Sequence, residues 1–159
     1  MAGCEPGKGA AVSLTLRLAT EADADDIAAL FAVSRRLLTF LPDLHTVEED
    51  QAHIRDHVLV DYRVTVAERD GRIVGFMAEL EGWIEHLYID AAELRTGVGS
   101  ALLADAKARN KSLELWCFAD NLRGRAFYEK HGFVAVKFTD GASNEAKAPD
   151  ILYRWERPA

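Results

Sequence analysis

Two glycines one residue apart, Gly97 and Gly99, stand between a strand-like run and an apolar helix-like run. Glycine lacks a side chain, so an anion can approach the backbone, and the free N–H groups of a first helical turn point at it. The segment therefore predicts a cradle for a phosphate or pyrophosphate. The alternative is a helix start at which glycine only relieves a crowded turn, and the two glycines alone do not choose between these interpretations.

The better-known nucleotide motifs do not fit this loop. A dinucleotide fingerprint needs a third glycine three residues after the second, and that position is Leu102. A P-loop needs Gly-Lys-Ser or Gly-Lys-Thr, which the chain lacks. Both nucleotide-binding classes are therefore disfavoured.

A second cluster of informative residues opens the next helix-like segment. Asn121, Gly124 and Tyr128 follow one another at i, i+3 and i+7, so they share one helix face. This face carries the amide of Asn121, no side chain at Gly124 and the phenol of Tyr128. Such an arrangement suits a ligand that lies along the face. In the alternative interpretation, Asn121 only caps the helix and Tyr128 is an ordinary half-buried aromatic.

Together these segments resemble the GNAT superfamily of N-acetyltransferases. The resemblance runs from Leu14 to Ile151, and its specific part extends from Glu85 to Phe133. It implies acetyl-CoA as co-substrate, with the pantetheine arm on the strand before the glycine loop and the pyrophosphate on the loop amides. The implied acetyl-CoA-binding residues are Leu87, Tyr88, Ile89, Arg95, Thr96, Gly97, Val98, Gly99, Ser100, Asn121, Gly124 and Tyr128.

Two positions depart from the family pattern. The first loop position is usually Arg or Gln, but here it is Leu94, with Arg95 one place along. Backbone amides supply most of the pyrophosphate contacts, so we expect binding to survive. Some members carry a catalytic carboxylate five residues before the asparagine, and here that position is Trp116, so a base must come from elsewhere or through water.

The resemblance implies direct attack of an amine on the acetyl thioester. An ammonium cannot attack, so a base should remove a proton, while Tyr128 protonates the departing thiolate. Base candidates on the strands are Glu85, His86 and Glu79. Adjacent strand residues point to opposite faces, so we expect only one of Glu85 and His86 to face the site. His86 has the more suitable ordinary pKa.

The acceptor stays open at this stage. The family shapes its acceptor pocket from the first two helices and the loop near residue 140, which makes Phe31, Arg35, Phe40 and Tyr62 candidate contacts. A primary amine on a small molecule or a peptide is the expected acceptor. The alternative function is a non-catalytic acyl-CoA-binding sensor or interaction module. Trp116, in place of a catalytic carboxylate, favours this alternative, whereas Tyr128 disfavours it because a pure binder needs no acid for the thiolate. In a third interpretation, the chain is an unrelated α/β domain whose motif matches are accidental. The presence of two motifs at the spacing of the family disfavours this interpretation.

Local patterns predict the elements that position these residues. Alternating and helical periodicities give an α/β fold in the order β-α-α-β-β-β-α-β-α-β-β, a GNAT-like mixed and mostly antiparallel central sheet flanked by helices. Asp70-Gly71 predicts a hairpin turn. The last strand is expected to close the sheet. The expected strands cover 12–18, 62–68, 73–80, 83–89, 113–118, 133–138 and 151–155, and the helices cover 20–40, 46–59, 97–110 and 121–132.

Composition limits the function classes. The chain has 159 residues, which suits one domain, here residues 12–159 after a disordered leader at 1–11. A net charge of −7 argues against nucleic-acid and anionic-membrane partners. Cys4 and Cys117 are expected to be free thiols, and the protein is expected to be cytoplasmic. The family resemblance makes a homodimer plausible, although no sequence feature establishes it.

No metal site is expected. His53 and His57 have helical i, i+4 spacing, and His45 precedes them, but no glutamate follows His53 as in a zinc protease. Surface histidines are therefore the favoured interpretation of all three.

Overall fold

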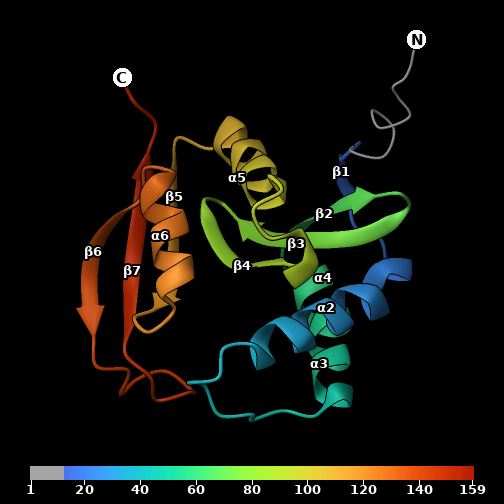
Figure 1. The fold of residues 1–159 in the computed structure, drawn as a ribbon, viewed down its shortest axis with the longest axis horizontal. Helices are drawn as coiled ribbons and strands as arrows, with labels where there is room; N and C mark the ends of the chain where they lie inside the picture. The colour runs from blue at the N-terminus through green and yellow to red at the C-terminus, as the bar shows by residue number, and fades with distance from the viewer. Residues whose placement is uncertain (1–12) are drawn as a thin grey trace.

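The computed structural model describes residues 13–159, and the predicted leader and Cys4 lie outside this range. Seven strands form a single sheet in the order β1-β2-β3-β4-β5-β7-β6 (Figure 1). All neighbours are antiparallel except β4 and β5. The strands are β1 (Thr15–Leu18), β2 (Arg63–Arg69), β3 (Arg72–Leu80), β4 (Trp83–Ile89), β5 (Ser112–Phe118), β6 (Val134–Thr139) and β7 (Asp150–Glu156).

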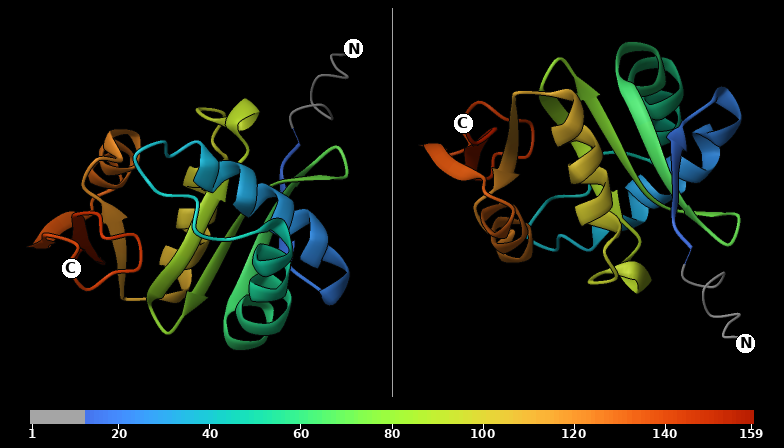
Figure 2. Two further views of the ribbon diagram at one scale, coloured as in Figure 1. Left: turned by 90° about the horizontal axis from the view of Figure 1, so that it is seen from below. Right: turned by 90° about the horizontal axis from the view of Figure 1, so that it is seen from above.

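Helices cover both faces of this sheet. The helical segments α2 and α3 lie on one face and α5 on the other (Figure 2). They are η1 (Glu21–Asp23), α2 (Ala24–Arg36), α3 (Val47–His53), η2 (Ile54–Val58), α4 (Leu59–Asp61), η3 (Ala91–Glu93), α5 (Val98–Arg109) and α6 (Leu122–Lys130). None of the helices within residues 13–159 is long and apolar enough to cross a membrane.

Most of the predicted elements are present, and the hairpin turn is where it was expected. Asp70 and Gly71 both have positive φ, 55° and 74°, as a type I′ turn requires. The twist of such a turn matches that of the flanking strands, so β2 returns directly as β3.

The first two helices differ from the prediction. The first begins as a 3-10 turn at Glu21 and ends at Arg36, which leaves residues 37–46 as a connection without helix. The second is interrupted by a π-helical turn, η2, between α3 and α4. A π turn inserts one residue into the hydrogen-bond ladder, which changes the faces that later residues present.

The last strand does not close the sheet at its edge. β7 lies between β5 and β6 and is antiparallel to both, so β6 is the edge strand. Strand pairing across the sheet, which local periodicity does not encode, decides this order.

Two apolar cores lie on the two faces of the sheet. One core, on the α5 and α6 side, contains Leu102, Leu103 and Tyr153, each fully buried. The other, on the α2 and α3 side, contains Ile27, Phe76 and related residues. The strands between them are therefore apolar on both faces, which explains their near-continuous hydrophobic sequence.

The sheet is divided between β4 and β5. The parallel ladder joining them contains one residue pair, Trp83 and Glu114, with the Glu114 N–H donating to the Gly82 carbonyl at 2.9 Å. Beyond this pair the two strands diverge, with β1–β4 on one side and β5–β7 on the other (Figure 1). The helix α5 connects them as the crossover that a parallel pair requires.

Candidate active site

The divergence of β4 and β5 leaves strand backbone facing a gap. Asp90 donates its N–H to the Val74 carbonyl of β3. In an antiparallel ladder only every second residue bonds the neighbouring strand, so the backbone N–H and C=O groups of Leu87 and Ile89 point away from β3, toward β5. On the opposite side, Ala119 donates to Pro149, so Trp116 and Phe118 direct theirs toward β4. Each side of the gap therefore carries backbone donors and acceptors that could pair with an extended ligand.

The glycine loop begins α5 at one end of the gap. Gly97 is the N-cap with a φ of 92°, and nothing lies within 4 Å of the place where a Cβ would stand. The first turn of α5 carries no acidic residue, and the N–H groups of residues 98–100 have no partner inside the helix. An open helix N-terminus with free N–H groups suits an anion such as a pyrophosphate. Arg95, with a φ of 69°, is exposed beside it, whereas Leu94 is half-buried.

Gly99 serves helix packing. A Cβ at this position would lie 2.9 Å from Cζ of Phe127 in α6. Its missing side chain therefore lets α5 and α6 approach each other. Glycine is needed at position 97 because of its positive φ, and at position 99 because the Phe127 ring lies against it.

Helix α6 brings the second cluster together. Asn121 is the N-cap, and its Oδ1 accepts the Gly124 N–H at 3.0 Å. A Cβ on Gly124 would lie 2.5 Å from Asn121 Nδ2, so the amide side chain lies directly over this glycine. Leu122, the first residue of α6, is exposed.

Tyr128 lies between the two halves of the sheet. Its ring makes edge contact with Phe133 at 5.6 Å and lies 6.2 Å from the ring of Tyr153. Burial raises the pKa of the Tyr128 phenol far above its ordinary value, and the neighbouring Cys117 on β5 and Tyr88 on β4 act in the same direction. The phenol thus stays protonated at neutral pH, which suits a proton donor.

The prediction that Glu85 and His86 face opposite sides of the sheet is wrong, because β4 contains a β-bulge at this point. The β3–β4 register passes from Ala78 opposite His86 to Glu79 opposite Ile84, so Glu85 is the extra residue on β4. A bulge breaks the strict alternation of side chains. Glu85 accepts the Trp83 indole N–H at 2.8 Å, and its charge raises the pKa of His53 on α3. Both Glu85 and His86 therefore face the α2–α3 side.

His86 is in contact with a second histidine that the sequence did not connect with it. Its Nε2 lies 3.4 Å from Nε2 of His53, and its ring also packs against Phe31 and Phe76. Burial lowers the pKa of His86 to about 3, with the neighbouring His53 and Arg35 adding to the effect. Burial also lowers the pKa of His53. Both rings are thus neutral near pH 7, so one Nε2 can donate a proton to the other.

The third base candidate, Glu79, is a structural residue. It is 4% exposed, forms an ion pair with Arg109, and accepts a hydrogen bond from Asn110 Nδ2 at 2.7 Å. These partners come from the end of α5 and fix the helix to β3. A carboxylate held in this way is unavailable to a substrate amine.

The candidate acceptor contacts lie on the same side of the sheet as His86. Phe31 packs edge-on against both His86 and Tyr88, and the Arg35 guanidinium carbon lies 5.7 Å from the Phe31 ring centroid. Phe40, from the connection after α2, contacts Phe118 on β5 at 6.0 Å. The structure thus places aromatic side chains from α2, the following connection and both central strands around the open end of the gap.

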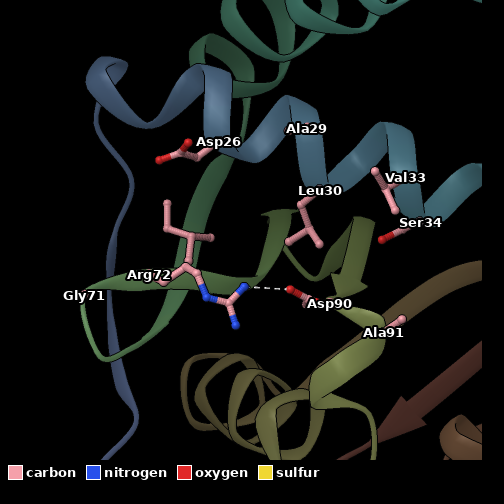
Figure 3. Close-up of a pocket in the computed structure, with 10 residues that line it drawn as sticks. Asp26, Ala29, Leu30, Val33, Ser34, Gly71, Arg72, Asp90 and Ala91 are labelled. Carbon is pink, nitrogen blue, oxygen red and sulfur yellow. Dashed lines mark hydrogen bonds and ion pairs between the residues drawn. The ribbon is translucent and has the colours of Figure 1, made fainter.

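A cavity of about 370 Å³ lies away from these residues (Figure 3). Leu30 and Val33 of α2 line it, and the ion pair between Arg72 and Asp90, at 2.9 Å, spans its floor. It contains none of the candidate catalytic side chains. Within residues 13–159, no three His, Cys, Asp or Glu side chains are arranged to hold a metal ion.

Comparison with known proteins agrees with this geometry. A family model described as an acetyltransferase (GNAT) domain matches residues 60–135, which extend from the end of α4 into β6. Over this segment the chain is similar to the GNAT acetyltransferase domain, in agreement with the resemblance that the two motifs indicate. The matched segment contains the bulged strand, the glycine loop and the helix that carries Tyr128.

Two curated relatives from Escherichia coli K12 are N-acetyltransferases. The chain is 29% identical to the peptidyl-lysine N-acetyltransferase YiaC over 104 residues, covering 64% of this chain and 69% of YiaC. It is 34% identical to the uncharacterized N-acetyltransferase YafP over 79 residues. That match covers 50% of this chain and spans about half of YafP, 51% of its length.

Solved structures share the fold over nearly the whole chain. Apo YjaB from Escherichia coli superposes with a TM-score of 0.77 at 20% identity, covering 92% of this chain and 99% of YjaB. The PaiA N-acetyltransferase of Thermoplasma acidophilum, in complex with coenzyme A, superposes with a TM-score of 0.68 at 19% identity. It covers 91% of this chain and 99% of PaiA. The divided, mostly antiparallel sheet flanked by helices is thus the GNAT fold.

Proposed function

We propose that this protein transfers the acetyl group of acetyl-CoA to a primary amine by direct attack. The observation that carries the proposal is the position of the protonated Tyr128 phenol, between the diverging strands β4 and β5 and beside an open helix N-terminus. A thioester substrate lying in the gap would place its sulfur within reach of this donor. The solved PaiA–coenzyme A complex, of the same fold, supports this choice of co-substrate.

The backbone would hold the co-substrate. Polar groups of Leu87 and Ile89 would pair with its amide-containing arm, and the amides of residues 98–100 would take its pyrophosphate. The strand N–H groups at the gap would also stabilise the negative charge that develops on the carbonyl oxygen under attack. Asn121 and Gly124 would border the same arm along α6.

Protons would move at two places. The amine nitrogen forms a bond to the acetyl carbon while its proton passes to the His53–His86 pair. The partly exposed His53 is the stronger base of the two, because burial lowers the pKa of His86 to about 3. As the C–S bond breaks, Tyr128 donates its proton to the leaving sulfur. Glu85, exposed beside His53, would favour the protonated state of that pair.

A thermal melt with and without acetyl-CoA tests the proposal, with ATP and NAD as controls. Ligand at about 100 times its dissociation constant adds roughly 2.7 kcal/mol to the free energy of unfolding. For a chain of this size, we expect the melting temperature to rise by about 5–10 °C. Thiol release in the presence of an amine acceptor would then demonstrate transfer, and the lysine side chain is a suitable first acceptor because YiaC is a peptidyl-lysine N-acetyltransferase.

Two results would count against the proposal. Equal stabilisation by ATP or NAD would mean that the cradle is not specific for acetyl-CoA. Stabilisation by acetyl-CoA with no turnover of any amine would favour the non-catalytic acyl-CoA-binding module, the function that Trp116 in place of a strand carboxylate first suggested.

A further inference from the structure

A cavity of about 340 Å³ opens on the α2–α3 side, where the end of α2 and the connection 37–46 meet the start of α3. The connection extends from α2 toward the β6–β7 loop before it returns to α3 (Figure 1). His45 on this connection hydrogen-bonds Glu145 of that loop at 3.0 Å, which fixes the outer wall. The apolar part of the lining includes Leu41, Pro42 and Leu44.

Three of the charged groups that line this cavity have ion-pair partners. Arg36 lies 3.5 Å from Asp43, and His45 is paired with Glu145. Asp50 is different: it lines the cavity and is 7% exposed, and within residues 13–159 its carboxylate has no hydrogen-bond or ion-pair partner. The charge of Asp50 acts on His45 and His53, but neither histidine is hydrogen-bonded to it, so this carboxylate at the cavity wall would bind a cation from outside.

Arg35 is the complementary group in the same cavity. Its guanidinium lies over the Phe31 ring and beside the Tyr88 phenol. Within residues 13–159 it forms no ion pair, although it adds to the effect of His45 in lowering the pKa of Glu145. Arg35 and Asp50 line one cavity without pairing with each other. The cavity therefore offers a cation and an anion at separate positions, which is the complement of a zwitterion.

Asp50 lies about one helical turn from His53, the histidine in contact with His86. Asp50 and His53 lie three residues apart on α3, so their side chains share a face at a spacing of roughly 5–6 Å. His53 is in turn in contact with His86 at the open end of the gap. A molecule bound at Asp50 by one amino group could therefore reach His86 with a second amino group a few bonds away.

We propose that the acceptor is a free basic amino acid, a zwitterion with a terminal side-chain amine. Asp50 binds its α-ammonium, Arg35 binds its α-carboxylate, and its side-chain amine lies at the His53–His86 pair. The side-chain nitrogen bonds to the acetyl carbon of acetyl-CoA and the C–S bond breaks; the nitrogen loses a proton to the histidine pair and the sulfur gains one from Tyr128. This inference rests on the proposed function and specifies its substrate class.

A panel of four acceptors tests the substrate class with the wild-type protein. Free lysine is compared with Nα-acetyl-lysine amide, which lacks both α-charges, with cadaverine, which lacks the carboxylate, and with pentylamine. We expect kcat/KM for lysine to exceed that of each of the others by about tenfold or more, since each lost charge pair removes a charge-assisted contact. Mass spectrometry and NMR of the product should place the acetyl group on the side-chain nitrogen.

Several outcomes would overturn the proposal. Equal or faster turnover of Nα-acetyl-lysine amide would favour a peptide-bound lysine, and equal turnover of cadaverine would favour a plain diamine. Acetylation of the α-nitrogen, or no turnover of lysine and ornithine, would also overturn it. A melting-temperature shift with acetyl-CoA in the same preparation shows that the proposed function stands even if the substrate class is wrong.

Matched variants test whether Asp50 and Arg35 bind the two α-charges of the acceptor. Asp50→Asn should raise KM for lysine by about tenfold and leave KM for pentylamine unchanged, whereas Asp43→Asn, at a paired and more exposed carboxylate of the same cavity, should change neither. Arg35→Gln should likewise raise KM for lysine, with Arg36→Gln as its control. Equal effects of Asp50→Asn on lysine and pentylamine would indicate a structural role for Asp50 and would contradict the proposal.

Discussion

Tyr128 and His86 are titratable side chains that burial holds in their neutral forms. For Tyr128, burial raises the pKa and keeps the phenol protonated. For His86, burial lowers the pKa to about 3, so the imidazole is neutral at pH 7 but is a weak base, and the partly exposed His53 beside it is the better proton acceptor. A protonated phenol and a neutral histidine pair thus lie in the same part of the molecule, and burial is the main reason for both protonation states.

Replacing Tyr128 by Phe should lower kcat by about 10² without a comparable change in acetyl-CoA affinity. The ring would keep its packing against Phe133, while the proton for the leaving sulfur would be lost. Steady-state thiol release gives kcat, and the melting-temperature shift with acetyl-CoA gives the affinity. A variant with wild-type kcat would remove Tyr128 from the role of acid.

The buried histidine should also make stability depend on pH. The unfolded state binds a proton at His86 below about pH 6.5, but the folded state does so only near pH 3, so stability is fully present above pH 6.5 and is lost as the pH falls through this window. Between pH 7 and pH 5, the wild-type free energy of unfolding should fall by about 1–2 kcal/mol more than that of His86→Gln. Urea unfolding at the two pH values measures this difference.

The comparison between the two proteins cancels the titration of groups that His86 does not contact. Glu145 raises the pKa of His45, which contributes stability that is lost at higher pH, the opposite sign, but it does so equally in both proteins. Identical pH dependence in the wild type and His86→Gln would mean that His86 titrates normally in the folded state.

Between elements, the approach of α5 and α6 brings the two sequence motifs together. Gly99 on α5 leaves room for Phe127 on α6, one residue before Tyr128. The packing of these helices therefore sets the distance between the amides at the α5 N-terminus and the phenol. Ser100 and His131 connect the same two helices by a side-chain hydrogen bond of 2.8 Å.

Gly99→Ala should separate these helices. The new methyl group would lie 2.9 Å from Phe127, so we expect the free energy of unfolding to fall by about 1–3 kcal/mol. Gly97→Ala is the matched control, since its methyl group would meet nothing within 4 Å and only the positive φ should cost about 1 kcal/mol. In a Phe127→Leu background, the cost of Gly99→Ala should shrink, and an unchanged cost would exclude Phe127 as its cause.

At the scale of the whole molecule, the sheet is two smaller sheets joined at one residue pair and through the crossover helix α5. A substrate that pairs with both strands would complete the missing ladder and connect the halves. This gives a physical reason for ligand binding to stabilise the entire chain as well as one loop.

Hydrogen exchange at individual backbone amides should reveal the pairing of acetyl-CoA with the strands. Leu87, Ile89, Trp116 and Phe118 direct their N–H groups into the gap, so acetyl-CoA should slow the exchange of those amides that pair with it, on one strand or both. Tyr88 is the internal control, because its N–H is part of the ladder with β3 and should be protected in both states. Equal exchange of the gap amides with and without acetyl-CoA would place the ligand elsewhere.

The sequence by itself determined the element types and the two motifs. Period-two alternation marked β2 to β4, the turn residues Asp70 and Gly71 fixed the hairpin, and the Gly97–Gly99 and Asn121–Tyr128 spacings indicated the family. These features are local, since a turn, a cap or a helix face depends on residues a few positions apart. Helix ends were less certain because the π turn after α3 and the end of α2 at Arg36 depend on packing.

Only the tertiary structure decided which side chains meet. The bulge at Glu85 places it on the same side as His86, and the contact of His86 with His53 joins positions 33 residues apart. Glu79 is part of a structural ion pair because Arg109 at the end of α5 reaches it, and Asp50 lines a cavity together with residues of the 37–46 connection. Such pairings arise from strand register and helix packing, which no local pattern in the chain encodes.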